Sequence, residues 1–75
     1  MLVLKDRSPT RLVCLFLRNI GSGRCRWEIS IQKTGPARAS GERTQWIVSE
    51  RVYSLPSEAL ADGFQRFDEE IARQP

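Results

Sequence analysis

The strongest constraint on the fold is an alternation of apolar and polar side chains between residues 24 and 34. The apolar positions are Cys25, Trp27, Ile29 and Ile31, and the polar positions are Arg24, Arg26, Glu28, Ser30 and Gln32. Successive side chains of a strand point to opposite faces of a sheet, so a period of two over this length predicts a β-strand with one apolar face. Such a strand is stable only when a second layer covers the apolar face of its sheet.

Two further segments are predicted to be strands of the same antiparallel sheet. The first runs from about residue 11 to 19, and Gly21–Gly23 follows it with residues that suit the positive φ angles of a tight turn. The other runs from about residue 43 to 53, and its alternation breaks near Ser49–Arg51, which indicates a bulge or a break. Between the second and third strands, the polar residues 35–42 predict a mobile loop.

The register of the first hairpin follows from its turn. A turn centred on Ser22 pairs residues whose numbers sum to 44, which sets Leu17 opposite Trp27, Leu15 opposite Ile29, and Val13 opposite Ile31. All six then point to one face. The same register sets Arg18 opposite Arg26, whereas a slip of two residues would set Arg18 against Glu28, and both registers remain open. In either register Cys14 and Cys25 lie on opposite faces, so we expect no disulfide between them.

The last segment, from about residue 55 to 73, is predicted to be an amphipathic helix. Ser54 or Ser57 is the expected N-cap, and Pro56 suits the first turn. The apolar residues recur at intervals of three and four, and we expect Phe64 and Phe67 among them to lie in the core: Leu55, Ala59, Leu60, Gly63, Phe64, Phe67 and Ile71. The expected fold class is therefore α+β, with one domain over residues 1–75: a three-stranded antiparallel sheet with a C-terminal helix on one face.

The composition argues against catalysis. The chain has no histidine and two cysteines, so a His-based zinc site, a Ser-His pair and a Cys-His pair are excluded. The adjacent carboxylates Asp68, Glu69 and Glu70 splay around a helix instead of converging, and Arg66 is spaced to form surface pairs with Asp62 and Glu70. We therefore expect a protein that is not an enzyme, without catalytic residues, metal or cofactor.

Localisation follows from the apolar runs. None of them approaches the roughly 20 residues that span a bilayer, and the N-terminal residues lack the order of a secretory signal. A cytoplasmic protein with reduced thiols and no membrane contact is expected.

Charge is divided unevenly along the chain. Residues 1–53 hold ten Lys and Arg against four Asp and Glu, a net of +6, and residues 54–75 hold two against five, a net of −3. Basic residues beside aromatic ones on a sheet suit contact with phosphates or with a protein partner. The candidate contact residues are Arg18, Arg24, Arg26, Lys33, Arg38, Arg43, Phe16 and Trp46. The broken third strand leaves the face of Trp46 open: outward beside Phe16 it would form an exposed aromatic pair, and inward it would fill the core.

One pattern resembles a known group of small domains. A Trp-bearing strand, Trp27–Ile31, precedes a polar loop, and Tyr53-Ser54 then leads into Ser57-Glu58-Ala59 at the start of a helix. This is similar to β-β-β-α domains of the AP2-like and integrase arm-binding type, and also to short uncharacterised bacterial proteins. The resemblance implies DNA binding by the exposed sheet through Arg24, Arg26 and Gln32, although Glu28 departs from it by placing an acid in the middle of that face.

Two functions follow as hypotheses. The first is a small non-enzymatic binding module of adaptor or inhibitor type, which would bind a protein partner or a second copy through the sheet face or a sheet edge. The alternative is a nucleic-acid-binding domain that uses the basic face of the sheet.

Overall fold

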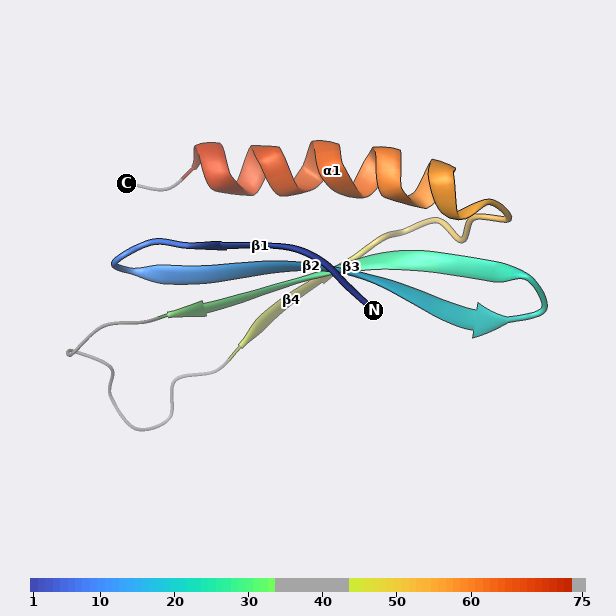
Figure 1. Cartoon of the computed structure of the whole chain (residues 1–75), viewed down its shortest axis with the longest axis horizontal. Coiled ribbons are helices and arrows are strands. Elements are labelled where there is room, and N and C mark those ends of the chain that lie inside the picture. Colours follow the sequence, from blue (N-terminus) through green and yellow to red (C-terminus); the bar gives the residue numbers. More distant parts are fainter. Residues whose placement is uncertain (34–43, 74–75) are drawn as a thin grey trace.

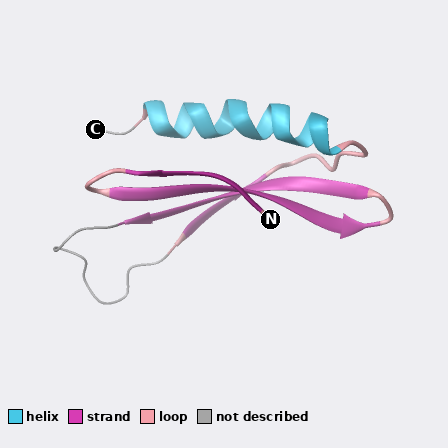
Figure 2. Cartoon of the chain, in the orientation of Figure 1, coloured by secondary structure: helices cyan, strands magenta, loops and turns pink. Residues whose placement is uncertain are grey.

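One helix lies along one face of an antiparallel sheet (Figure 1). The computed structural model describes residues 1–33 and 44–73. Its elements are β1 (Leu2–Arg7), β2 (Arg11–Gly21), β3 (Arg24–Lys33), β4 (Gln45–Val48) and α1 (Pro56–Ala72), and Figure 2 distinguishes the helix from the strands by colour. In the sheet, neighbouring strands have the order β1-β2-β3-β4. The predicted α+β class with a C-terminal helix is confirmed, but the sheet has four strands instead of three. The predicted loop 35–42 lies outside the described residues.

The strand missing from the prediction is β1, which pairs with β2 along the edge of the sheet. Leu2 lies opposite Phe16 and Leu4 opposite Leu15, so a bulge occurs between them. Because of this extra residue, Leu2 and Leu4 point to different faces although they are two positions apart. The period of two that reveals a strand in a sequence is therefore interrupted near the start of β1.

The hairpin of β2 and β3 has the register that the Ser22-centred turn predicts. The pairs Val13–Ile31, Leu15–Ile29 and Leu17–Trp27 are all present, and the slip by two residues is wrong. Positive φ angles occur at Gly21, Ser22 and Gly23, which confirms the predicted use of this cluster. A bulge between Asn19 and Gly21 completes the turn.

The predicted strand over residues 43–53 is shorter in the structure. β4 ends at Val48, opposite Glu28, and pairing resumes only at Tyr53, which bridges Cys25. Four residues, 49–52, therefore lie against the two residues of β3 between Cys25 and Glu28. The two extra residues on this side interrupt the pairing, which is the break that the disturbed alternation near Ser49–Arg51 indicates.

The core lies between α1 and the two central strands. Val13, Leu15 and Ile29 are fully buried, and Trp27 is 8% exposed, as its place in the alternation predicts. Two of the residues that α1 turns toward the sheet are small, Ala59 and Gly63.

Gly63 allows the helix to approach β3 closely. A Cβ atom at this position would lie 3.1 Å from Trp27 Cβ and 3.2 Å from Leu15 Cδ1. Both neighbours belong to the packed core, so a Cβ atom at position 63 requires them to shift by a few tenths of an ångström, and a branched side chain requires a larger shift.

Two predictions for the helix are wrong. Phe64 is 39% exposed, because it lies about 100° around the helix axis from Gly63, beside the buried stripe and not within it. Phe67, closer to the centre of the stripe, is buried as predicted. The N-cap is Leu55 and neither Ser54 nor Ser57, so the helix begins without a capping hydroxyl, and Pro56 occupies the first turn.

The end of the helix is attached to β2 through the backbone carbonyl of Glu70. Glu70, predicted as a surface residue, is 4% exposed. Its Oε2 lies 2.9 Å from Arg73 Nη1 and 3.4 Å from Arg66 Nε, and its carbonyl oxygen accepts a bond of 2.9 Å from Arg11 Nη2. Three arginines thus compensate a carboxylate and a carbonyl group at the helix–sheet interface.

We predict that Gly63→Val lowers the free energy of unfolding by about 2–3 kcal/mol, because the added atoms overlap Trp27 and Leu15. The matched control is Ala61→Val, which adds a β-branched residue at an exposed helix position. Urea denaturation of both variants measures the difference. Equal losses in the two variants would show that the close approach at Gly63 does not matter.

Candidate functional site

The sheet face opposite α1, here called the open face, is the first candidate site. Alternation and register assign to it Leu2, Lys5 and Arg7 of β1; Leu12, Cys14, Phe16 and Arg18 of β2; Arg24, Arg26, Glu28, Ser30 and Gln32 of β3; and Trp46 and Val48 of β4. In the part of the chain that the structure describes, no helix or strand covers this face. The two cysteines are free, and they lie on opposite faces as predicted.

An aromatic pair spans the middle of the open face. Trp46 points outward and is 50% exposed, and its ring centroid lies 5.7 Å from that of Phe16 at an interplanar angle of 40°. The two residues lie on β4 and β2, with β3 between them, so their rings lean over the central strand to meet. Ser30, the small residue opposite Trp46, is buried at 7% exposure. Of the two orientations that the sequence left open for Trp46, the structure has the outward one, beside Phe16.

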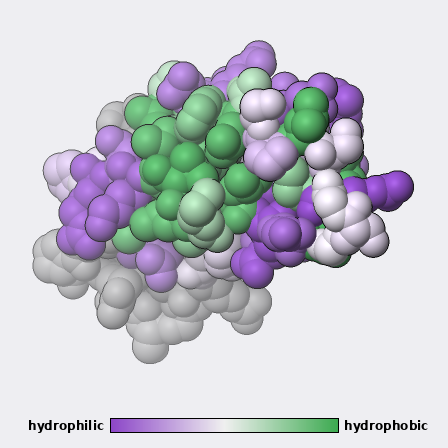
Figure 3. Space-filling model, turned by 45° about the vertical axis from the view of Figure 1, so that its right-hand side comes forward, coloured by the Kyte–Doolittle hydropathy of each residue, from purple (hydrophilic) through white to green (hydrophobic). Residues whose placement is uncertain are grey.

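Aliphatic side chains extend the apolar surface on both sides of this pair. In one row across the sheet, Leu2 lies opposite Phe16, and Val48 lies opposite Glu28 at the other end. Leu2 and Val48 are 48% and 40% exposed. Exposed apolar residues also lie outside the open face, on α1 and in the segment before it. Figure 3 shows, from the side of the molecule, a continuous hydrophobic area bordered by hydrophilic residues, so apolar surface is not a property of the open face alone.

A buried carboxylate organises the basic part of the open face. Arg18 and Arg26 lie directly opposite one another on β2 and β3, a like-charge pair that destabilises a sheet. Glu28 is 5% exposed, and its Oε2 lies 3.0 Å from Arg18 Nε, 2.9 Å from Arg26 Nε and 2.9 Å from Arg26 Nη2. One carboxylate thus holds two guanidinium groups and leaves the cluster with a net charge of +1.

The other predicted contact residues do not all join this cluster. Arg24 is exposed on the same face, at the end of the hairpin. Lys33 lies opposite Arg11, on the side of the sheet that α1 covers, so it is not one of the basic residues of the open face. The alternation of β3 decides this, because Lys33 is an even number of positions from Ile29. Arg38 and Arg43 lie outside the described residues.

Sequence reasoning missed four residues of the open face. Leu2, Lys5 and Arg7 belong to β1, whose bulge hides its strand pattern. Val48 was within a predicted strand, but the broken alternation gave no basis for choosing its face. The one sequence signal for Lys5 and Arg7 is their spacing of two residues, which would place both side chains on the same face of a strand.

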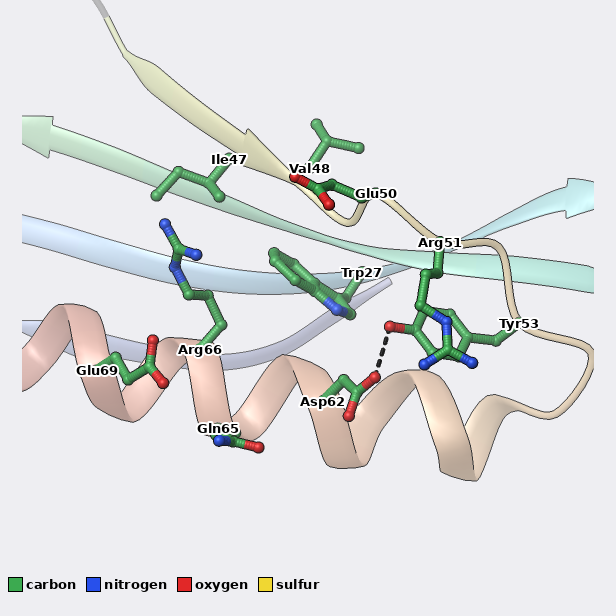
Figure 4. Close-up of a pocket in the computed structure, with 10 residues that line it drawn as sticks. All are labelled: Trp27, Ile47, Val48, Glu50, Arg51, Tyr53, Asp62, Gln65, Arg66 and Glu69. Atoms are coloured by element: carbon green, nitrogen blue, oxygen red, sulfur yellow. Dashed lines mark hydrogen bonds between the residues drawn. The ribbon is translucent and has the colours of Figure 1, made fainter.

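A cleft beside α1 is the second candidate site. It has a volume of about 450 Å³ and lies between the helix and the segment from β4 to Tyr53, with Trp27 and Ile47 among its apolar lining residues (Figure 4). Tyr53 Oη donates a hydrogen bond of 2.7 Å to Asp62 Oδ2, and the guanidinium carbon of Arg51 lies 5.4 Å from the Tyr53 ring centroid. Asp62 was predicted to pair with Arg66 on the surface, whereas the partner of Arg66 among the described residues is Glu70.

Burial raises the pKa of the Tyr53 hydroxyl, and the hydrogen bond to Asp62 raises it further. The neutral hydroxyl is the form that donates to the carboxylate, so Tyr53 keeps its proton and attaches the segment before α1 to the helix. A tyrosine held in this way is not an activated nucleophile. The Tyr53–Asp62 contact has no sequence signal, because it depends on how far the helix lies from the sheet.

Three comparisons bear on the identity of the chain. None of the family models, curated proteins or solved structures against which the chain was compared matches it. Within the described residues, no helix is long and apolar enough to cross a membrane, and no group of three or more Cys, Asp or Glu side chains is placed to hold a metal ion.

We predict that Glu28→Gln lowers the free energy of unfolding by about 1–2 kcal/mol, because it leaves Arg18 and Arg26 facing each other without a counter-charge. The same substitution should cost much less in an Arg18→Gln background, where the repulsion is already absent. Urea denaturation of the four proteins of this double-mutant cycle measures the coupling. A coupling of zero would contradict the role assigned to Glu28.

We predict that alkaline pH destabilises the fold through Tyr53. Its pKa in the folded chain lies above the ordinary 10.0, so the unfolded chain loses this proton first and stability falls as the pH rises above 10.0. Tyr53 is the only tyrosine of the chain, so a spectrophotometric titration of the phenolate reports on it directly. In the Asp62→Asn variant, the midpoint of the phenolate titration should move toward the ordinary pKa of 10.0, since the carboxylate that favours the protonated form of Tyr53 is removed. A wild-type midpoint at or below 10.0 would refute this.

Proposed function

We propose that this chain is a small non-enzymatic protein-binding module, of adaptor or inhibitor type, that binds its partner through the open face. The observation that carries the proposal is the aromatic pair of the partly buried Phe16 and the exposed Trp46, with the exposed Leu2 and Val48 in the same row of the sheet as Phe16. Protein interfaces are built around aromatic anchors and arginines, with apolar side chains at the centre and polar ones at the rim. The open face has this arrangement of residue types.

The charge of the open face supports a partner other than a second copy. The face has Lys5, Arg7, Arg18, Arg24 and Arg26 as cations, and its acid among the described residues is the buried Glu28. Two copies placed face to face would bring these cations together, at a cost in electrostatic repulsion. A partner with an apolar surface and acidic residues around it complements the face in both respects.

Nucleic acid is the second candidate partner, and the same aromatic pair favours it. Single-stranded nucleic acids bind to proteins by stacking bases on aromatic rings within a basic groove. Against this, the aliphatic Leu2 and Val48 occupy the row next to Arg18 and Arg26, and Glu28 removes one of the positive charges of that pair. Protein binding is therefore the better supported of the two functions.

A photo-crosslinking experiment tests the proposal. Benzoylphenylalanine replaces Trp46 in one variant and Asp68, on the exposed side of α1, in a control variant. Both are expressed in the source cells, irradiated, and analysed by mass spectrometry. We expect one discrete protein to be crosslinked at position 46 and not at position 68, because only the first position lies on the open face.

Other outcomes of the crosslinking contradict the proposal. A covalent dimer of this chain at position 46 would make a second copy the occupant of the face. Crosslinks to nucleic acid that disappear as salt is raised would favour the alternative function, because phosphate contacts weaken with salt. The same products at positions 46 and 68 would show that the open face has no specific role.

A further inference from the structure

The Arg18–Glu28–Arg26 cluster fixes the positions of two guanidinium groups as well as offsetting the repulsion between them. Burying a carboxylate costs several kcal/mol unless charged partners compensate it, and apolar residues in the same space are often at least as stable. Glu28 is nevertheless buried at 5% exposure, with Phe16 on one side and Val48 on the other. What this arrangement achieves is a fixed position for two guanidinium groups next to the aromatic pair.

The contacts to Glu28 leave part of each guanidinium group exposed. Arg18 contacts the carboxylate through Nε, and Arg26 through Nε and Nη2. Their side chains are 55% and 38% exposed. A guanidinium group has five N–H donors in one plane, so the edges that do not face Glu28 can bind a second acceptor. Because the Nε atoms are already held, less conformational entropy is lost when that acceptor binds.

The acceptor must be an anion that can sit against apolar surface. The cluster has a net charge of +1, which one carboxylate neutralises completely. The row of the sheet next to Arg18 and Arg26 is formed by Leu2, Phe16, Glu28 and Val48, so a bound anion lies beside exposed aliphatic and aromatic carbon. An acidic side chain that neighbours an apolar one on a protein chain fits this surface, because the carboxylate neutralises the cluster and the apolar side chain covers the adjacent carbon.

We infer that Arg18 and Arg26, held in place by Glu28, bind an Asp or Glu carboxylate of the protein partner while the partner's adjacent apolar side chain covers Phe16 and Trp46. This inference rests on the proposed function and adds the chemistry of the contact. Glu28 is a positioning residue here, because it acts through the two arginines. The partner segment is accordingly an acidic one in which apolar and carboxylate side chains alternate or adjoin.

Two synthetic peptides test the inference. One alternates leucine with glutamate, and the other has glutamine in place of every glutamate. NMR titration follows the indole N–H of Trp46 and the Nε–H groups of Arg18 and Arg26. We expect the glutamate peptide to shift all three signals, and to bind about tenfold more tightly than the glutamine peptide, because charge-assisted hydrogen bonds to the arginines are lost in the latter.

Variants of the arginines supply the matched controls. Arg18→Gln should abolish the preference for the glutamate peptide. Lys33→Gln removes the same charge from the side of the sheet that α1 covers, away from the open face, and should preserve the preference. Arg18→Lys retains the charge without the planar donor group, and we expect it to recover the preference only in part. Equal effects of Arg18→Gln and Lys33→Gln would show that the peptide responds only to the overall charge of the protein, and would overturn the inference.

The titration separates failure of the inference from failure of the proposed function. If both peptides shift Trp46 with equal affinity and the arginine signals stay unchanged, the carboxylate site is refuted while protein binding by the open face stands. If neither peptide shifts Trp46, both are refuted. If a single-stranded oligonucleotide of thymidine shifts the three signals at lower concentration than the glutamate peptide, phosphate is the ligand of the cluster and nucleic acid is the partner.

Discussion

The close contact between Gly63 of α1 and Trp27 of β3 determines how the two layers of this protein are arranged. A hydrogen atom in place of a side chain at position 63 lets the helix lie against the indole and Leu15. The helix thereby covers β2 and β3, the strands it contacts, and fills the space above them with Ala59 and Phe67. A chain of this size buries a small core, so the close approach of these two layers contributes much of its stability.

The position of the helix also decides which residues are available for binding. α1 covers one face of the sheet and leaves the other face open. On that open face lie the Phe16–Trp46 pair, the aliphatic Leu2 and Val48, and the Arg18–Glu28–Arg26 cluster. Their polar and apolar groups are close together because β2 and β3 bring them into neighbouring rows. Arg18 and Arg26 would repel one another across the hairpin without Glu28, so the residue that permits the register also orients the two proposed contact groups.

The parts of the fold with an undisturbed pattern could be predicted from the sequence. The β2–β3 register follows from the turn at Ser22 and from the shared apolar face, because any odd shift would expose Ile29 and Ile31. β1 could not be predicted, since its bulge places Leu2 and Leu4 on opposite faces. Phe64 has helical spacing but lies beside the buried stripe, and that distinction depends on the angle at which α1 lies on the sheet. Of the candidate site, Phe16, Arg18, Arg24 and Arg26 could be placed on the open face in advance, whereas Lys5, Arg7, Leu2 and Val48 could not.

The sequence by itself determined the α+β class, the central hairpin, the break after β4 and the separation of Cys14 from Cys25. These are local properties, which depend on alternation, turn residues and helical periodicity along a continuous stretch of chain. Only the tertiary structure decided that Trp46 meets Phe16 across β3, that Glu28 is buried between two arginines, and that Tyr53 donates to Asp62. Each of these contacts joins residues from different elements, and their distances depend on strand order, bulges and the closeness of the helix, which no stretch of sequence encodes alone.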